Sequence, residues 1–415
     1  MGRLSLWANR DFVKLWTGQT ISELGSHITY YGLPLLAVLT LNASGSTLGL
    51  LTVAGSIPAI VFGLVAGVWV DRLRRKPVMI AADLGRALAL GTIPLAAVLG
   101  VLHEWQLFVV AALAASLGVF FNAAYRAYLP SLVERDALVE SNSRLAFSGS
   151  LVEIVGPGMA GGLVQAITAP MAMLFDAISF VISAVSILWI HAVETPSPPP
   201  EARQPALTEA REGLRFVFRQ PILRALALQT VTDNFFGSFF AVLYTLYCIR
   251  VLHLSPVAIG LTIGMGGAGS VVGSLLAKRA ADRFGLGRTL SGVLLIGSAF
   301  GPLIILAAFA RPWAFWLMML AQAGDITRMI YDIHSTSLRQ AIPPARLLGR
   351  VNASMDLLGV CLIPVGALLG GWLGDQIGAT ATLTIAILGS LFAKLWVILS
   401  PIRRLTQLPT EPVEG

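Results

Sequence analysis

Long runs of apolar residues, each about as long as a lipid bilayer is thick, recur from one end of the chain to the other. A helix rises about 1.5 Å per residue, so about 20 apolar residues carry it across the hydrocarbon layer. Lipid offers the backbone no hydrogen-bond partners, so each run is expected to pair its own N–H and C=O groups as a helix. The sequence therefore predicts an all-α membrane protein with twelve transmembrane helices. Their expected ranges are residues 12–39, 47–70, 77–101, 105–128, 146–167, 170–193, 222–250, 257–281, 289–310, 313–338, 350–374 and 378–400.

The composition favours a bilayer over nucleic acid as the surroundings of this chain. Only 12% of the residues are charged, against about 25% in a typical soluble domain. The net charge of +7 could indicate a nucleic-acid partner. The basic residues, however, lie in short loops between apolar runs, as in the cytoplasmic loops of membrane proteins. We therefore expect lipid, and no nucleic acid, as the partner of this surface.

Several landmarks of the sequence return about half a chain later. Asp71 returns as Asp282, and the glycine pair at 161–162 returns at 370–371. Similarity at one fixed offset indicates an internal repeat. The sequence thus predicts two six-helix repeats rather than twelve unrelated helices.

A proline-rich segment separates the two expected repeats. Its prolines, from Pro196 to Pro205, disfavour a helix and favour an extended, exposed chain. Residues 207–219 then place apolar and arginine side chains at helical spacing, which predicts a short amphipathic helix on the inner membrane surface. This helix is either a connector or a contact for lipid or a partner. The expected layout is a first bundle over 1–194, a cytoplasmic linker with this helix over 195–219, a second bundle over 220–402 and a cytoplasmic tail over 403–415.

The distribution of basic residues predicts the orientation in the membrane. Most of the 29 lysines and arginines lie in the N-terminal tail, in the loops after the even-numbered runs and in the C-terminal tail. The opposite side carries only Arg250 and Arg311. Because cytoplasmic loops are enriched in Lys and Arg, both termini are expected in the cytoplasm of a multi-pass protein of the plasma (inner) membrane.

One charged loop follows the second apolar run, and an echo of it follows the eighth. A carboxylate at a helix end beside several arginines gains from charge pairing and from the helix dipole. The alternative is that these charges only set the topology. The residues of the first copy are Gly67, Asp71, Arg72, Arg75 and Lys76, and those of the second are Asp282, Arg283 and Arg288.

The fifth run contains a cluster of small residues around a proline: Gly156, Pro157, Gly161 and Gly162. Small residues let helices approach closely, and a proline removes one backbone hydrogen bond. A kinked, tightly packed helix is expected, and ordinary helix packing would account for the same pattern.

Taken together, the charged loop, its echo and the two repeats resemble the signature of the major facilitator superfamily. The glycine cluster of the fifth run resembles the antiporter motif of drug-exporting members, and Phe175–Phe180 resembles the subgroup of siderophore and macrolide exporters. The resemblance implies a transporter. It also implies that the loop's carboxylate and arginines hold the two halves together on the cytoplasmic side and separate as the protein changes state.

Ionisable side chains inside the apolar runs are costly in lipid and are therefore functional candidates. Asp325, Arg328 and Asp332 are spaced to share one face of the tenth run. They form either a static ion pair or one that protonation of a carboxylate opens. Glu153 and the Asp83–Arg86 pair lie nearer the cytoplasmic ends of their runs and are candidates for a gate rather than for cargo.

The first and seventh runs occupy equivalent places in the two repeats, and each carries a carboxylate followed by aromatic residues. Facing walls of this kind would suit a bulky amphipathic or cationic molecule through stacking and cation–π contact. Aromatic residues at helical spacing also occur in ordinary helix packing. The proton-coupling candidates are Glu23, Asp233, Asp325, Arg328 and Asp332, and the cavity candidates are His27, Tyr30, Phe240, Tyr244 and Tyr247.

These observations predict a proton-coupled secondary exporter of a small amphipathic or cationic compound that works by alternating access. An importer or symporter with the same fold is one alternative, and a receptor or scaffold that transports nothing is another. An enzyme is not expected, because the five histidines show no metal-ligand spacing and no nucleophile or phosphate-loop motif is present. The expected partners are a small-molecule substrate, protons and lipid. We expect a monomer without cofactor or metal.

Overall fold

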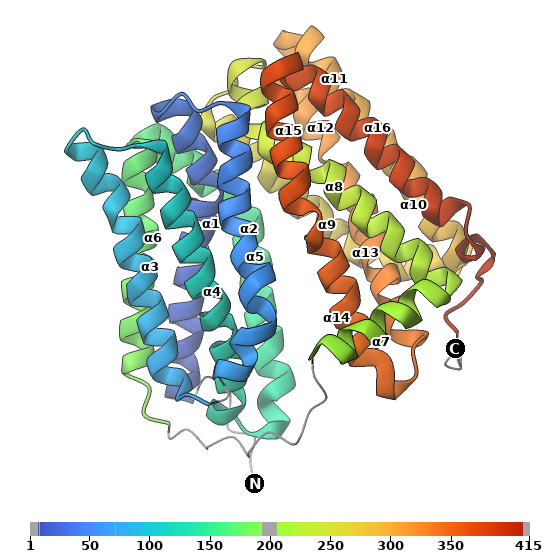
Figure 1. Cartoon of the computed structure of the whole chain (residues 1–415), viewed down its shortest axis with the longest axis horizontal. Helices are drawn as coiled ribbons and strands as arrows, with labels where there is room; N and C mark the ends of the chain where they lie inside the picture. Colours follow the sequence, from blue (N-terminus) through green and yellow to red (C-terminus); the bar gives the residue numbers. More distant parts are fainter. Residues whose placement is uncertain (1–6, 8, 71, 193–205, 410–415) are drawn as a thin grey trace. The chain divides into compact units, whose positions relative to one another are not determined.

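The structure is a computed structural model that describes Trp7 and residues 9–70, 72–192 and 206–409 (Figure 1). Every regular element in these residues is a helix. The longer helices of the N-terminal half are α1 (Arg10–Thr40), α2 (Gly45–Val70), α3 (Arg75–Val98), α4 (Glu104–Leu132), α5 (Leu138–Ala166) and α6 (Ala169–Leu188). Those that follow are α7 (Ala206–Arg219), α8 (Pro221–Arg250), α9 (Pro256–Phe284), α10 (Leu286–Ser298), α11 (Gly301–Phe309), α12 (Ala314–Ala321), α13 (Gly324–Ala341), α14 (Ala345–Cys361), α15 (Ile363–Ile377) and α16 (Ala379–Ile398).

Within the residues that the structure describes, nine helical stretches are long and apolar enough to cross a membrane. The all-helical architecture expected from the sequence is confirmed. Helices α1 and α8 and the α12–α13 pair coincide with three further expected runs but are not among the nine. These helices carry candidate ionisable residues, including Glu23, Asp233 and Asp325, which explains their lower apolar content.

The chain divides into two compact units. The first contains α1, α3 to α6, most of α2 and Ser255–Gly264 at the start of α9. The second contains α7, α8, α10 to α16, the rest of α9 and Ser44–Gly49 at the start of α2. The first residues of α2 and of α9 therefore belong to a different unit from the rest of their helix.

The first unit is organised around the contact between α1 and α6. Three glycines spaced seven residues apart on α1, Gly18, Gly25 and Gly32, lie where a side chain would overlap residues of α6. Small residues at such a spacing allow two helices to approach closely. The apolar core of this unit lies toward one end, where Phe12, Phe121, Tyr128 and other buried side chains meet.

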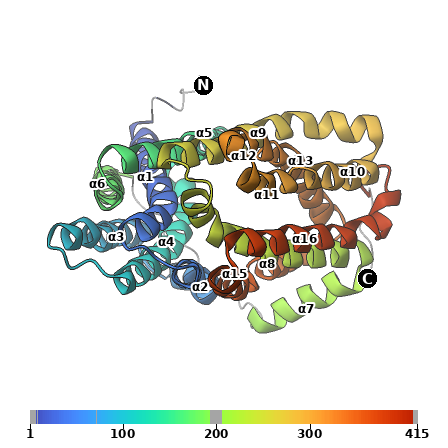
Figure 2. The same ribbon diagram turned by 90° about the horizontal axis from the view of Figure 1, so that it is seen from above.

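The second unit contains helices that are interrupted rather than continuous. The sequence predicts single helices over 289–310, 313–338 and 350–374, but each is divided in two, as α10–α11, α12–α13 and α14–α15. Pro302 and Pro364 stand at the start of α11 and α15, where a proline removes a backbone hydrogen bond. Figure 2 shows α8 and α16, which pack closely, side by side in this unit. Two of the three expected runs are nevertheless among the candidate membrane spans, as Leu286–Phe309 and Ala345–Ile377.

The start of α2 is held within the second unit by a carboxylate on α15. Asp375 accepts hydrogen bonds from the backbone N–H groups of Gly45 and Ser46, at 2.7 and 2.8 Å, and from the Ser46 hydroxyl. A carboxylate at a helix N-terminus satisfies unpaired N–H groups and complements the helix dipole. Asp375 thus caps α2 with a side chain from a distant part of the chain.

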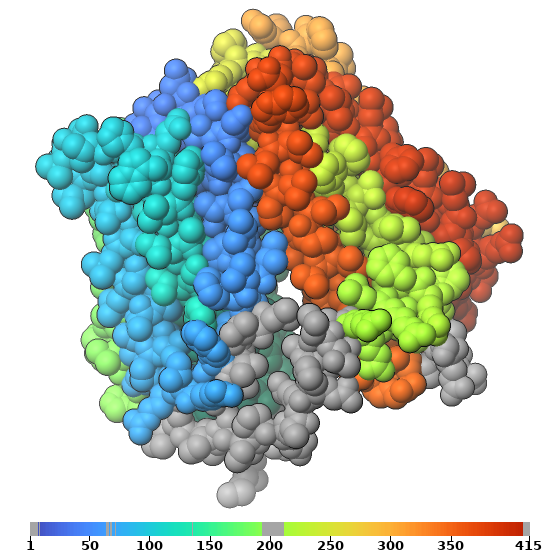
Figure 3. Space-filling view, viewed as in Figure 1, coloured from blue at the N-terminus to red at the C-terminus, as the bar shows by residue number. Residues whose placement is uncertain are grey.

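Helix α7 packs against α14 in the second unit (Figure 3). Phe216 and Val217 are part of the apolar core, and Glu212 forms an ion pair with Arg350 of α14. Gly213 lies directly against the backbone carbonyl of Arg350. The apolar side of this amphipathic helix therefore packs on protein. Its expected place on the inner membrane surface stays a prediction. The expected linker residues 195–205 lie outside the described residues.

Candidate functional site

In the first unit, the candidate residues of α1 lie against α5. The Glu23 carboxylate is placed next to Gly149, and the His27 side chain next to Gly156, where a larger residue would overlap the ring. Glu153 of α5 lies within electrostatic range of both Glu23 and His27. His27 Nδ1 is buried and has no hydrogen-bond partner among the described residues. The sequence placed Glu153 at a gate, whereas the structure brings it to the Glu23–His27 pair.

In the second unit, charged residues from helices α8 and α13 gather around Arg328 of α13. The Arg328 Nε atom lies 3.9 Å from the Asp332 carboxylate, and Asp233 of α8 and Asp325 lie within electrostatic range of this pair. The side chains of Arg328 and Asp332 are 70% and 57% exposed. Asp325 stands in the first turn of α13, with its carboxylate against Gly266 of α9. The shared face predicted for the tenth run is therefore an open, charged face.

Lys394 of α16 belongs to the same charged face but was not among the predicted site residues. It donates a hydrogen bond of 2.8 Å to the Ser298 hydroxyl and lies within electrostatic range of Asp233. A lysine inside an apolar run was the signal that could have identified it. The face then carries three carboxylates, Asp233, Asp325 and Asp332, and two cations, Arg328 and Lys394.

The aromatic candidates occupy different environments. Tyr30 is 70% exposed, whereas Tyr244 and Tyr247 are buried in the second unit. Tyr247 donates a hydrogen bond of 2.5 Å to the backbone carbonyl of Ile304, and Phe240 packs against Tyr244 with ring centroids 5.1 Å apart. In this structure Tyr244 and Tyr247 contribute to the packing of the second unit, and the sequence pattern alone did not distinguish that role from cavity lining.

The charged loop after α2 is described in part. Asp71 lies outside the described residues, and Gly67 lies in α2. Lys76 donates hydrogen bonds to the backbone carbonyls of Leu188 and Ile190, at 3.0 and 2.6 Å. A cation near these carbonyls satisfies acceptors that the end of a helix leaves unpaired. Lys76 therefore holds the end of α6 within the first unit.

The other basic residues of the two loops lie near the surface. Arg72 is exposed and Arg75 is half-buried. Asp282, Arg283 and Arg288, the residues of the second copy, are exposed.

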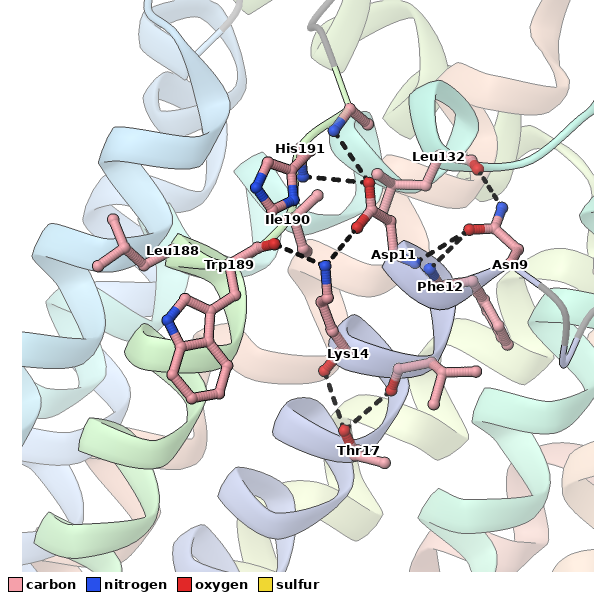
Figure 4. Close-up of polar contacts among 12 residues, drawn as sticks. Asn9, Asp11, Phe12, Lys14, Thr17, Leu132, Leu188, Trp189, Ile190 and His191 are labelled. Atoms are coloured by element: carbon pink, nitrogen blue, oxygen red, sulfur yellow. Dashed lines mark hydrogen bonds and ion pairs between the residues drawn. The ribbon is translucent and has the colours of Figure 1, made fainter.

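Asp11 and Lys14 at the start of α1 hold the segment that follows α6 (Figure 4). Lys14 donates to the Asp11 carboxylate at 2.8 Å and to the Trp189 carbonyl at 2.6 Å. The same carboxylate accepts from the backbone N–H groups of His191 and Ala192, at 3.1 and 3.0 Å. The sequence pattern did not reveal this network, because its partners are about 180 residues apart.

The network determines the ionisation of Asp11, which precedes the first expected membrane run. Burial by itself would raise the pKa of Asp11, but the hydrogen bond from Lys14, the two backbone N–H groups and the charge of Lys14 outweigh it and lower the pKa. Because the folded-state pKa lies below the ordinary value, the ionised carboxylate stabilises the fold above that value. This stabilisation is lost as the pH falls through the folded pKa.

Replacing Asp11 with asparagine is expected to lower the free energy of unfolding near neutral pH by about 1.5 kcal/mol, the low end for hydrogen bonds to a charged group, because the side chain is 20% exposed. As the pH falls from neutral through the folded pKa of Asp11, which lies below the ordinary value, the difference from wild type should shrink, and it should vanish once Asp11 is protonated in both states. Thermal unfolding of the purified protein in detergent across this pH range measures it. Asp136→Asn, at an exposed carboxylate, serves as control. A difference that persists in acid would contradict the assignment.

The glycine cluster of the fifth run forms a close contact with the start of α9 inside the first unit. A side chain at Gly161 would overlap the backbone carbonyl of Pro256, and one at Gly260 would overlap the backbone carbonyl of Pro157. A side chain at Gly162 would meet open space. The two adjacent glycines therefore have different environments, and the sequence motif alone does not reveal this difference.

Comparisons with known proteins agree with the resemblance seen in the sequence. The family model of the Major Facilitator Superfamily matches residues 15–363. The multidrug efflux pump Tap of Mycolicibacterium fortuitum is 30% identical over 407 residues, which cover 94% of this chain and 95% of that protein. Macrolide efflux protein A of Streptococcus pyogenes is 24% identical over 372 residues, covering 88% of this chain and 90% of that protein.

A solved structure shares the fold. The crystal structure of a bacterial homologue of the iron transporter ferroportin, in its inward-facing state, matches with a TM-score of 0.73 at 16% sequence identity. The match covers 95% of this chain and 99% of that chain. At this identity the likeness concerns the fold, whereas the family model and the Tap relative extend over most of the sequence. This chain is therefore a multi-pass membrane protein that belongs to the Major Facilitator Superfamily.

Proposed function

We propose that this protein is a proton-coupled exporter of a small amphipathic or cationic compound, working as a monomer by alternating access in the plasma (inner) membrane. We also propose that the protein has twelve membrane spans in two repeats and that both termini are cytoplasmic. The efflux pumps among its relatives support export. The residues of the charged loops, including Asp71, Arg72 and Arg75, keep their proposed role in a cytoplasmic gate.

The exposed charged face of the second unit carries this proposal. Arg328 and Asp332 lie on helix α13, which follows the apolar helix α12, and most of their side chains are exposed. Charges in the hydrocarbon layer are costly, and in membrane proteins they face water or other protein groups. We therefore infer that this face lines the aqueous path of the transported compound.

Proton coupling would follow from the charge balance of the same face. Its three carboxylates exceed its two cations by one, so one proton is sufficient to neutralise it. Protonation of Asp332 would release Arg328, and deprotonation would restore the ion pair. A cationic compound and a proton would then compete for the same carboxylates, which is the requirement for antiport.

Everted membrane vesicles test the proposal, because an exporter accumulates its substrate inside them. With a fluorescent organic cation as the probe, wild-type vesicles should show accumulation that a protonophore abolishes. Asp332→Asn and Arg328→Gln should reduce accumulation to the level of vesicles without the protein, and Asp136→Asn should match wild type. The variants must be present in the membrane in equal amounts, as measured by immunoblot.

The alternatives predict different results in the same assay. An importer would accumulate the probe in right-side-out vesicles and not in everted ones. A receptor or scaffold would move none of a panel of organic cations in either orientation. Accumulation that persists with the protonophore would contradict proton coupling.

A further inference from the structure

Three charged residues are buried together in the first unit, away from the charged face described above. Asp83 and Arg86 lie on α3 and Asp176 lies on α6, and their exposed fractions are 0%, 9% and 1%. The Arg86 guanidinium forms an ion pair with one oxygen of Asp83 and lies within electrostatic range of Asp176. Two carboxylates thus share one cation in a site closed to solvent.

Aromatic rings hold the cation of this cluster in place. The Arg86 guanidinium lies 4.6 Å from the centroid of the Phe121 ring, on α4, and 4.1 Å from that of the Phe180 ring, on α6. A guanidinium stacks favourably on aromatic faces and keeps its charge at all physiological pH values. Arg86 therefore supplies one fixed positive charge, and any change of protonation must occur on the carboxylates.

Hydroxyl groups hold Asp176 in place. Thr29 of α1 donates to its Oδ2 atom at 2.5 Å, and Ser179 donates to its Oδ1 atom at 3.1 Å. Gly25 of α1 lies directly against the same carboxylate, where a larger residue would overlap it. Asp176 thus has a partner for each oxygen without a second cation.

Three polar atoms of the cluster have no partner within hydrogen-bond distance in the part of the chain that the structure describes. They are Asp83 Oδ2, Arg86 Nε and the Ser183 hydroxyl. Ser183 lies one helical turn beyond Ser179 and Phe180 on the same face of α6. A bare carboxylate oxygen in a buried site is costly, whereas a protonated one can donate a hydrogen bond and carries no charge. The buried Asp83 oxygen, with the Ser183 hydroxyl nearby, is therefore a suitable position for a proton.

We propose that Asp83, Arg86 and Asp176 form a proton-binding site that holds one proton between its two carboxylates. The charge balance supports this, because two carboxylates and one arginine leave one negative charge in excess, and an uncompensated charge is strongly disfavoured in a buried site. The other groups that pack on the cluster are neutral: Thr29 from α1, Phe121 from α4, and Ser179, Phe180 and Ser183 from α6. The role of this proton in transport rests on the proposed function, but its presence does not.

Infrared spectroscopy of the purified full-length protein in lipid nanodiscs tests the proposal directly. A protonated carboxyl has a C=O stretching band that ionised carboxylates lack and that shifts in D₂O. Near neutral pH, the difference spectra of wild type minus Asp83→Asn and wild type minus Asp176→Asn should each contain this band. Either substitution leaves one carboxylate, which stays ionised beside Arg86. The control difference spectrum, wild type minus Asp136→Asn, should lack the band, and its absence from both cluster spectra would overturn the proposal.

Thermal unfolding provides the second measurement, because asparagine resembles a protonated aspartate in shape and charge. Each single variant should keep the wild-type unfolding midpoint, whereas the double variant, which leaves Arg86 without a carboxylate, should unfold at a clearly lower temperature. Single variants that fail to fold would contradict the proposal, since the site would then require both negative charges.

The proposed proton coupling of transport and the proposed buried proton can be refuted independently. If the band is present but vesicle accumulation resists a protonophore, the proposed proton coupling fails and the buried proton remains. If the band is absent while accumulation is proton-driven, the coupling proton binds elsewhere, and the charged face of the second unit is the remaining candidate.

Discussion

Replacing Arg86 with methionine is expected to destabilise the protein more than any other single substitution of a charged residue considered above. The change removes the one cation that the described residues place beside the buried carboxylates of Asp83 and Asp176, and it removes the guanidinium from between Phe121 and Phe180. Breaking a buried ion pair by removing one partner costs about 3–5 kcal/mol. Equilibrium unfolding in mixed micelles, followed by circular dichroism, measures this loss.

Arg144→Met is the matched control, since it removes the same side chain from an exposed ion pair. Arg144 lies 3.6 Å from Glu140 on α5, and the two side chains are 46% and 54% exposed. Exposed pairs contribute about 0–1 kcal/mol, so this variant should remain close to wild type. Equal losses in the two variants would mean that Arg86 is no more important to the fold than a surface arginine, which would refute the buried cluster.

Substituting the two adjacent glycines of α5 with alanine is expected to change stability in opposite directions. At Gly161 the new methyl group would overlap the backbone carbonyl of Pro256, and a backbone atom cannot rotate away as a side chain can. Overpacking of this kind costs about 1–3 kcal/mol. Transport by Gly161→Ala should fall as well, because the start of α9 can no longer pack on α5 as it does here.

Gly162→Ala provides the control within the same motif. Apart from the residue itself, its chain neighbours and the backbone of its own helix, no described atom lies within 4 Å of the position that its new Cβ would occupy. Glycine in a helix interior is less favourable than alanine by about 0.5–1 kcal/mol, so this variant should be slightly more stable than wild type. The unfolding midpoints of the two variants measure these changes in stability. A loss of stability in Gly162→Ala equal to that in Gly161→Ala would contradict the observed contact.

The sequence was sufficient to predict the elements and the family. Apolar runs of bilayer length predicted helices, and the charged loop with its echo identified the Major Facilitator Superfamily, which the family model confirms. Ionisable residues inside apolar runs, such as Glu23 and Asp325, could be recognised as unusual from composition alone. All of these signals are local, because they depend on residues that are neighbours in the chain or one helical turn apart.

Tertiary structure decided which of these residues act together. Lys394 meets Asp233, and Asp176 meets Arg86, although each pair is separated by about 90 residues or more. Such contacts depend on which helix faces meet, and helix periodicity leaves that choice open because several faces of a membrane helix are apolar. The burial of Tyr247 was decided in the same way, by packing against a distant segment of the chain.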